Sequence, residues 1–165
     1  MLVNAYSKRV FNLAYQFAGS YQEAEDLTQD IFIKLYGALP KYDPGRDFTA
    51  WLLTLARNQL IDAYRKTKWE KKGREGFEER DWPAGASADP EAGLEAAASR
   101  KIVWESLGLL SPELRLAIIL RDIQDKSYDE AAEVLGIPVG TLKSRINRGR
   151  LQLARIIKEK KGAPS

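Results

Sequence analysis

Apolar residues recur at spacings of three and four positions in two stretches of this chain, and residues 70–99 between them show no such repeat. This spacing matches the turn of an α-helix, so each stretch predicts amphipathic helices that bury one face. We find no alternation of apolar and polar residues that predicts strands. The expected fold is therefore all-α, with two small helical domains, residues 1–69 and 100–162, joined by a flexible linker over 70–99.

Composition narrows the chemistry that the chain can perform. It has 165 residues, 26 Lys and Arg against 23 Asp and Glu, and neither Cys nor His. This removes disulfides, thiol nucleophiles, imidazole bases and nearly every zinc or haem site. No apolar run approaches the roughly 18 residues of a membrane span, and the N-terminus lacks the long apolar core of a secretion signal. We expect a cytoplasmic protein without membrane insertion, metal or other cofactor, whose mildly basic charge permits nucleic-acid binding.

The first stretch predicts three helices. The first ends at Gly19, and the run SYQE at 20–23 is a capping box that starts the second, which should end near Ala38. Residues 40–47 are rich in Pro, Gly and Asp, which predicts an exposed loop before a third helix that begins near Phe48. The residues expected in the core of the first two helices are Val10, Leu13, Ala14, Phe17, Ala24, Leu27, Ile31 and Leu35.

The second stretch contains the most specific pattern of the chain. Ser127 opens a capping box for a short helix that Gly136 ends, and a second helix follows after a turn. Ala132 is small where the two helices would cross, while Leu142 and Ile146 would hold the second helix against the core. This pattern predicts a helix-turn-helix. The exposed face would suit phosphates and base edges, or would be only a solvated face. Its residues are Lys143, Ser144, Arg145, Asn147 and Arg148.

Two features of the first stretch indicate surfaces beyond its own core. The second helix begins with acidic residues, which by themselves favour the helix dipole. However, Phe32, Ile33 and Tyr36 spread apolar surface beyond one stripe, and a partner would cover it. The third helix interleaves basic with aromatic side chains, which either stack unpaired bases or lie in the core.

Three motifs, taken together, resemble one family. They are AEDLTQDIF at 24–32, FTAWL at 48–52 followed by ARN at 56–58, and YDEAA at 128–132 followed by GTLKSR at 140–145. In this order they are similar to the extracytoplasmic-function (ECF) group of bacterial RNA polymerase sigma factors, with the last most similar to the envelope-stress type. The resemblance implies an alternative sigma factor that binds RNA polymerase core and directs promoter recognition, DNA opening and transcription initiation.

The resemblance also implies partners and site residues. Residues 1–69 would hold the polymerase clamp through Asp26, Gln29, Asp30, Phe32 and Tyr36. The same domain would contact the minus-ten element, with a single-stranded non-template base flipped into the loop, through Asn58, Asp62, Arg65, Tyr42 and Asp47. Residues 100–162 would contact the minus-thirty-five duplex through Thr141, Lys143, Ser144, Arg145 and Arg148. An anti-sigma factor is a further expected partner. Relatives carry more sequence before the first helix, so we expect that helix to be short and the clamp-facing domain to be incomplete.

Three other functions stay open at this point. A helix-turn-helix regulator that binds an operator without polymerase would use only residues 127–150. A sigma-like protein that sequesters a partner would keep the clamp face and lose promoter selectivity. An enzyme would depend on carboxylates that no base, nucleophile or phosphate-binding glycine loop accompanies. Those carboxylates are Asp122, Asp125, Asp129, Glu130 and Glu133.

Overall fold

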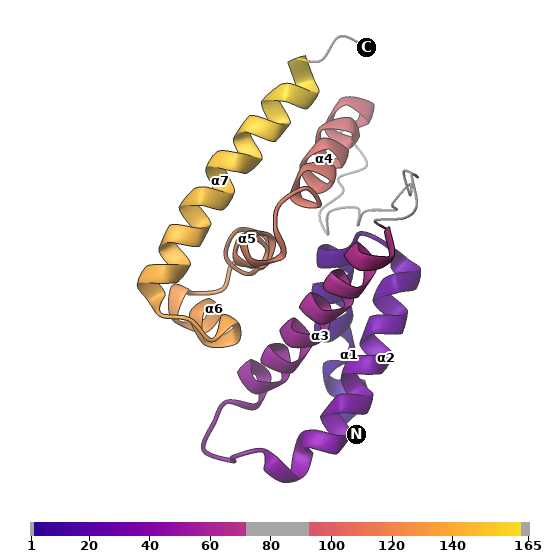
Figure 1. Cartoon of the computed structure of the whole chain (residues 1–165), viewed down its shortest axis with the longest axis vertical. Helices are drawn as coiled ribbons and strands as arrows, with labels where there is room; N and C mark the ends of the chain where they lie inside the picture. Colours follow the sequence, from indigo (N-terminus) through magenta and orange to yellow (C-terminus); the bar gives the residue numbers. More distant parts are fainter. Residues whose placement is uncertain (1, 72–92, 163–165) are drawn as a thin grey trace.

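The computed structural model describes residues 2–71 and 93–162, which form helices and turns without a strand among them. The first half consists of α1 (Leu2–Ala18), α2 (Tyr21–Ala38), the 3-10 turn η1 (Leu39–Lys41) and α3 (Phe48–Lys71). The second half consists of α4 (Gly93–Leu107), α5 (Pro112–Ile118), the π-helical turn η3 (Ile119–Ile123), α6 (Tyr128–Leu135) and α7 (Val139–Gly162). Figure 1 shows the two halves side by side, with α7 along one edge of the molecule. The all-α prediction is confirmed.

The first half is a bundle in which α2 and α3 both pack against α1. Gly19 adopts a φ of 72°, which lets the chain turn out of α1, and the hydroxyl of Ser20 accepts a hydrogen bond from the Glu23 amide at 3.3 Å. All eight residues predicted for the core are buried except Leu27, which is half-buried. Helix α1 has 17 residues, so the expectation of a short first helix is wrong. Its apolar stripe continues to Phe11 and Tyr15, which pack against the core.

The second half contains the predicted helix-turn-helix. The hydroxyl of Ser127 accepts from the Glu130 amide at 3.1 Å, and Gly136 ends α6 in the left-handed conformation with a φ of 65°. Leu142 and Ile146 bury α7 against α5 and α6. The predicted helix-turn-helix is confirmed. The packing of Leu142 and Ile146 leaves the opposite face of α7 exposed.

The described helices extend into both ends of the predicted linker, residues 70–99. Helix α3 continues to Lys71, and α4 begins at Gly93, before the expected boundary near residue 100. The first turns of α4 are rich in Ala, Leu and Glu, which favour helix without needing a buried face, so no apolar stripe marks them. Leu94 is accordingly 91% exposed. The rest of the predicted linker, residues 72–92, lies outside the described residues.

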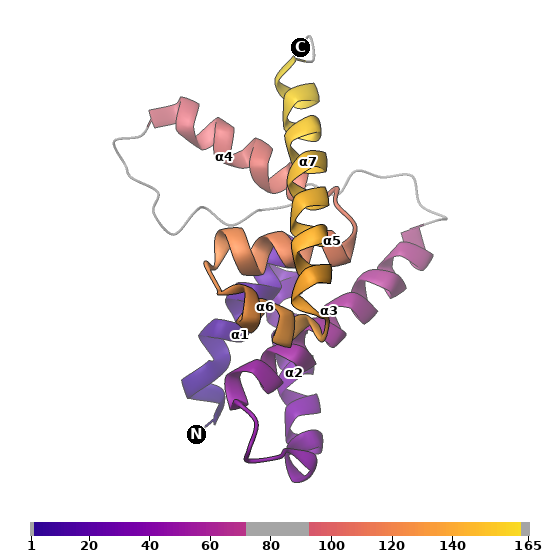
Figure 2. The ribbon, with the colours of Figure 1, turned by 90° about the vertical axis from the view of Figure 1, so that its left-hand side faces the viewer.

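The two halves pack against each other, with α6 beside α3 and α5 reaching both α3 and the end of α1. Figure 2 shows α6 and the start of α7 next to the N-terminal half of α3. The side chain of Arg115 is buried at this junction, with its Cζ 4.7 Å from the centre of the Phe17 ring and 5.4 Å from that of Tyr64. Across the two described ranges, no helix combines the length and apolarity that crossing a bilayer requires.

Candidate nucleic-acid and polymerase interfaces

Helix α2 presents a mixed acidic and apolar face. Asp26, Gln29, Asp30 and Tyr36 are all exposed, and their spacing places them on one side of the helix. Phe32 is only 6% exposed and lies in the core of the first half, so its ring is not part of this face. The exposed apolar positions are Ile33, at 70%, and Tyr36, at 52%. We call Asp26, Gln29, Asp30, Ile33 and Tyr36 the α2 face.

The loop between η1 and α3 is held by its own hydrogen bonds. Tyr42 is half-buried, and its hydroxyl donates to the main-chain carbonyl of Arg46. An Asp43 carboxylate oxygen accepts from the Gly45 amide at 2.9 Å, and one from Asp47 accepts from the Ala50 amide at 3.3 Å. Tyr42 and Asp47, which the sequence predicts to contact DNA, therefore both brace the loop.

Helix α3 carries the other predicted minus-ten residues on one exposed face. Asn58, Asp62 and Arg65 are separated by four and three positions, and all three side chains are exposed. A guanidinium nitrogen of Arg65 lies 3.9 Å from a carboxylate oxygen of Glu113 on α5. The adjacent stripe of α3 is the one that packs against the second half. The structure thus brings this face to the edge of the junction between the halves.

Helix α7 brings four of the five predicted minus-thirty-five residues together. Thr141, Ser144, Arg145 and Arg148 are neighbours at helical spacing; Arg145 is half-buried and the other three are exposed. Lys143 emerges about 160° around the helix axis from Thr141, because each residue turns the helix by about 100°. The ammonium of Lys143 lies 5.3 Å from the centre of the Tyr128 ring, so Lys143 belongs to the edge that α7 shares with α6.

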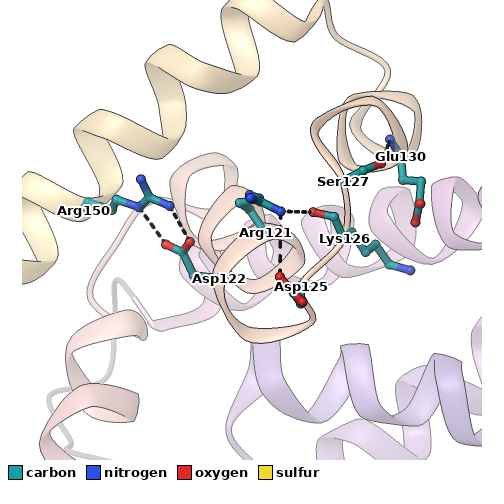
Figure 3. A network of polar contacts seen from close by, with 7 residues as sticks. All are labelled: Arg121, Asp122, Asp125, Lys126, Ser127, Glu130 and Arg150. Carbon is teal, nitrogen blue, oxygen red and sulfur yellow. Dashed lines mark hydrogen bonds and ion pairs between the residues drawn. The ribbon is translucent and has the colours of Figure 1, made fainter.

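A network of polar contacts fixes α7 and α6 to the turn that follows α5 (Figure 3). Arg150 on α7 forms two hydrogen bonds to the Asp122 carboxylate, at 3.0 and 2.6 Å, and these raise the pKa of the guanidinium. Arg121 donates to the Lys126 carbonyl at 2.8 Å and lies 3.8 Å from Asp125. Asp122, one of the carboxylates considered above for an enzyme, is therefore engaged in an ion pair that holds α7 to the turn after α5. Asp125, another of them, pairs with Arg121 within that turn.

Arg57 ties α3 to α6 beside the exposed face of α7. Its Nη1 donates to the carbonyl of Leu135 at 2.7 Å, and the hydroxyl of Thr54 donates to that of Val134 at 3.1 Å. Burial lowers the pKa of the Arg57 guanidinium, and the positive charge of Arg145 lowers it further. Two cations therefore meet where the first half packs against the helix-turn-helix.

Comparison with known proteins accounts for both halves. The Sigma-70 region 2 family model matches residues 2–70, and the Sigma-70, region 4 model matches residues 100–153. The ECF RNA polymerase sigma factor SigW of Bacillus subtilis is 32% identical over 164 residues, which cover 96% of this chain and 88% of SigW. The chain belongs to the ECF group of RNA polymerase sigma factors. The resemblance of its three motifs is thereby confirmed.

Further relatives place both halves of the sigma factor in the same family. It is 35% identical to the ECF sigma factor SigE of Mycolicibacterium smegmatis over 156 residues, or 92% of the chain, and spans 58% of that relative's length. The sigma factor RpoE of Bartonella quintana, solved in complex with the anti-sigma factor NepR, superposes with a TM-score of 0.72 at 27% identity over 94% of both chains. CnrH, solved with the cytosolic domain of CnrY, gives 0.66 at 28% identity over 95% of this chain and 85% of that one. The function of the present chain is accordingly that of an alternative sigma factor, which directs promoter recognition and transcription initiation.

The predicted site residues leave out two positions of the sigma factor's surfaces and junctions: Ile33, which the sequence marks only as apolar surface for a partner, and Gly149. Ile33 continues the spacing of Asp26, Gln29 and Asp30, so helical periodicity would have placed it on the α2 face in preference to Phe32. Gly149 is buried where α7 crosses α5, and a β-carbon there would lie 2.9 Å from Cγ1 of Ile118. A glycine inside a helical pattern signals such a close approach.

Proposed function

We propose that this sigma factor divides its work among three surfaces. The α2 face binds RNA polymerase core, the exposed face of α3 with the loop before it contacts the minus-ten element, and the first turns of α7 contact the minus-thirty-five duplex. Residues 1–69 and 100–162 act as the two functional domains. The single observation that supports this division best is that all three surfaces stay exposed while the halves pack together. The protein performs no catalysis of its own and works in the cell interior, with the polymerase.

The α2 face offers carboxylates around an exposed apolar centre at Ile33. Such a surface matches a partner that supplies cations around a hydrophobic patch, because buried apolar area gives affinity and charge gives orientation. Asp30→Ala and Ile33→Ala should each weaken binding of fluorescently labelled core polymerase. Lys34→Ala is the matched control, since Lys34 is exposed on α2 outside this face. Unchanged core affinity in both variants would refute the proposed role of α2.

The exposed face of α3 contacts opened DNA, whereas the first turns of α7 contact duplex DNA. Opening exposes unpaired bases, which a polar loop can bind, whereas duplex reading needs a rigid helix that fits the major groove. The two contacts reinforce one another, because each raises the effective concentration of the other on the shared polymerase. Asn58→Ala should therefore reduce DNA opening, and Arg148→Ala should reduce affinity for closed duplex. The reverse pattern would contradict this division.

We also propose an anti-sigma factor as a partner. Support comes from RpoE and CnrH, whose solved structures contain NepR and the cytosolic domain of CnrY. An inhibitor of this kind must cover surfaces that polymerase needs, so bound inhibitor and core polymerase should compete. Titration of the inhibitor against labelled sigma factor with and without core tests this. Simultaneous binding of both would contradict inhibition by occlusion.

A further inference from the structure

Leu151 is a large apolar residue on the outer side of α7. Its side chain is 70% exposed, whereas the apolar residues that hold this helix to the rest of the protein are turned away from solvent. Leu142 and Ile146 are buried, and Leu153 and Ile156 are partly buried against the core. Leu151 therefore lies outside the stripe that packs α7.

The position of Leu151 continues the surface proposed to contact the duplex. At about 100° per residue, Leu151 and Ser144 point within about 20° of each other around the helix axis, and Asn147 lies between them along the axis. All three side chains are exposed. Figure 2, which views the molecule from the side on which α7 lies, shows this helix in front of the other elements. A duplex that lies along the first turns of α7 therefore has access to Leu151.

The residues around Leu151 indicate the charge of its partner. Arg148 and Arg155 lie one turn before and one turn after it, and both are exposed, as is Lys158 further along. This basic surroundings favours an anionic partner, while the leucine gains free energy only where that partner offers apolar atoms. Duplex DNA meets both requirements, because it carries phosphates and displays the C5 methyl group of thymine in its major groove.

A protein partner would need a wider apolar surface. Leu151 is the one large apolar side chain of α7 that is exposed, and the others on this helix, which the structure describes throughout, are buried or half-buried. Protein interfaces instead centre on several apolar side chains that lie together. A single exposed leucine between arginines fits one methyl group better than it fits a protein surface.

We propose that Leu151 contacts the C5 methyl group of a thymine in the minus-thirty-five duplex and so selects thymine at one position, an inference that rests on the proposed role of α7. Leu151 follows Arg148 by three residues, or about 4.5 Å along the helix. The rise of a base pair is about 3.4 Å, so the thymine should lie one or two base pairs from the pair next to Arg148. Gly140 and Ser144 are small residues on the same side of α7, which lets the helix approach the floor of the groove closely.

The test uses holoenzyme and closed promoter duplexes in which each position of the upstream element carries, in turn, thymine or uracil, and cytosine or 5-methylcytosine. Each pair of bases differs only by the C5 methyl group. With the unaltered sigma factor, the methylated base should bind roughly 2- to 5-fold more tightly at one position, as expected for one buried methyl group. Leu151→Ala should reduce this difference to less than about 1.5-fold and leave the other positions unchanged. Its melting temperature should stay the same, because the side chain is exposed.

Lys158→Ala is the matched control, because Lys158 is exposed on the same side of α7 two turns further along. It should keep the preference for the methylated base. A preference that survives Leu151→Ala, or that Lys158→Ala also removes, would overturn the role of Leu151. So would the absence of any methyl preference while Arg148→Ala still weakens duplex binding, and Leu151 would then serve a protein partner or none. If Arg148→Ala has no effect on duplex binding either, the proposed function of α7 is itself refuted.

Discussion

The guanidinium of Arg115 on α5 donates from Nη1 to the main-chain carbonyl of Phe17, 3.0 Å away in the last turn of α1. Carbonyls in the last turn of a helix lack partners within the helix and carry its negative dipole end, so a cation is favoured there. Arg57 makes the same kind of contact with Leu135, at the end of α6. Each half of this sigma factor thus supplies an arginine that satisfies a helix end of the other half.

The Arg115 contact should hold the halves together. Arg115→Ala removes hydrogen bonds to three carbonyls and leaves acceptors without partners at a buried junction, which should lower the free energy of unfolding by about 3 kcal/mol. Chemical denaturation measures this. Arg155→Ala, at an exposed position on α7, should change it by less than about 0.5 kcal/mol. Equal effects of the two substitutions would show that Arg115 contributes nothing beyond its charge.

Separation of the halves can be followed directly, because the chain contains no cysteine that would compete for labels. Dyes on Lys34→Cys and Lys158→Cys, one in each half, should give a single high-transfer population in the free protein. Adding Arg115→Ala should shift a substantial part of it to lower transfer. An unchanged distribution would mean that other contacts suffice to keep the halves together.

Arg145 should affect stability and DNA binding in opposite directions. Its charge lowers the pKa of the partly buried Arg57, which means that it disfavours the charged form of Arg57 in the folded protein. Arg145→Ala should therefore leave the free energy of unfolding unchanged or raise it by up to about 0.5 kcal/mol, while duplex affinity falls. Arg57→Ala should lower the free energy of unfolding by about 2 kcal/mol, since it removes the bond to Leu135. A large loss of stability in Arg145→Ala would contradict this assignment.

Gly149 should be the least replaceable glycine of α7. The β-carbon of an alanine there would lie 2.9 Å from Ile118 Cγ1 and 3.0 Å from its Cδ1, so α5 and α7 would have to move apart. We expect a loss of about 1–3 kcal/mol in the free energy of unfolding. Gly140→Ala is the matched control, with open space around the added atom, and should be neutral or stabilising by up to about 1 kcal/mol. Thermal melts of the two variants should therefore move in different directions, and a destabilised Gly140→Ala would exclude the steric explanation.

The salt dependence of duplex binding should separate the two ends of α7. Each phosphate contact that is lost lowers the slope of log affinity against log salt by about 0.9. Arg148→Ala should reduce the slope by this amount, and Arg155→Ala, two turns further along the helix, should not change it. Fluorescence anisotropy at several salt concentrations gives both slopes. Equal reductions would mean that the DNA runs along the whole of α7.

Local features of this fold could be predicted because each has a short-range cause. Ser20 and Ser127 precede an amide three residues later that their hydroxyls bond, and Gly136 supplies the left-handed turn between α6 and α7. The start of α4 could not be placed from periodicity, because its first turns bury no stripe. Phe32 is buried and its neighbour Ile33 is exposed. The motif alone does not show which of the two adjacent residues lies on the exposed side of α2.

The packing of the two halves had no signal in the sequence. Arg57 and Arg115 both donate to main-chain carbonyls, and a carbonyl is present at every residue, so no side-chain pattern reveals the contact. The loop residues illustrate the same limit. Tyr42 and Asp47 are polar residues in a turn, and only the structure shows that both form hydrogen bonds to main-chain groups of the loop and of α3.

Run-off transcription with purified bacterial core polymerase and a promoter library tests the central claim most directly. We predict transcripts that appear only when this sigma factor is added and that share a two-part motif at fixed spacing. Arg148→Ala should weaken selection of the upstream part and Asn58→Ala that of the downstream part. Duplex binding without any added transcription would contradict the account and favour an operator-binding regulator, and core binding without transcription would favour a sequestering protein.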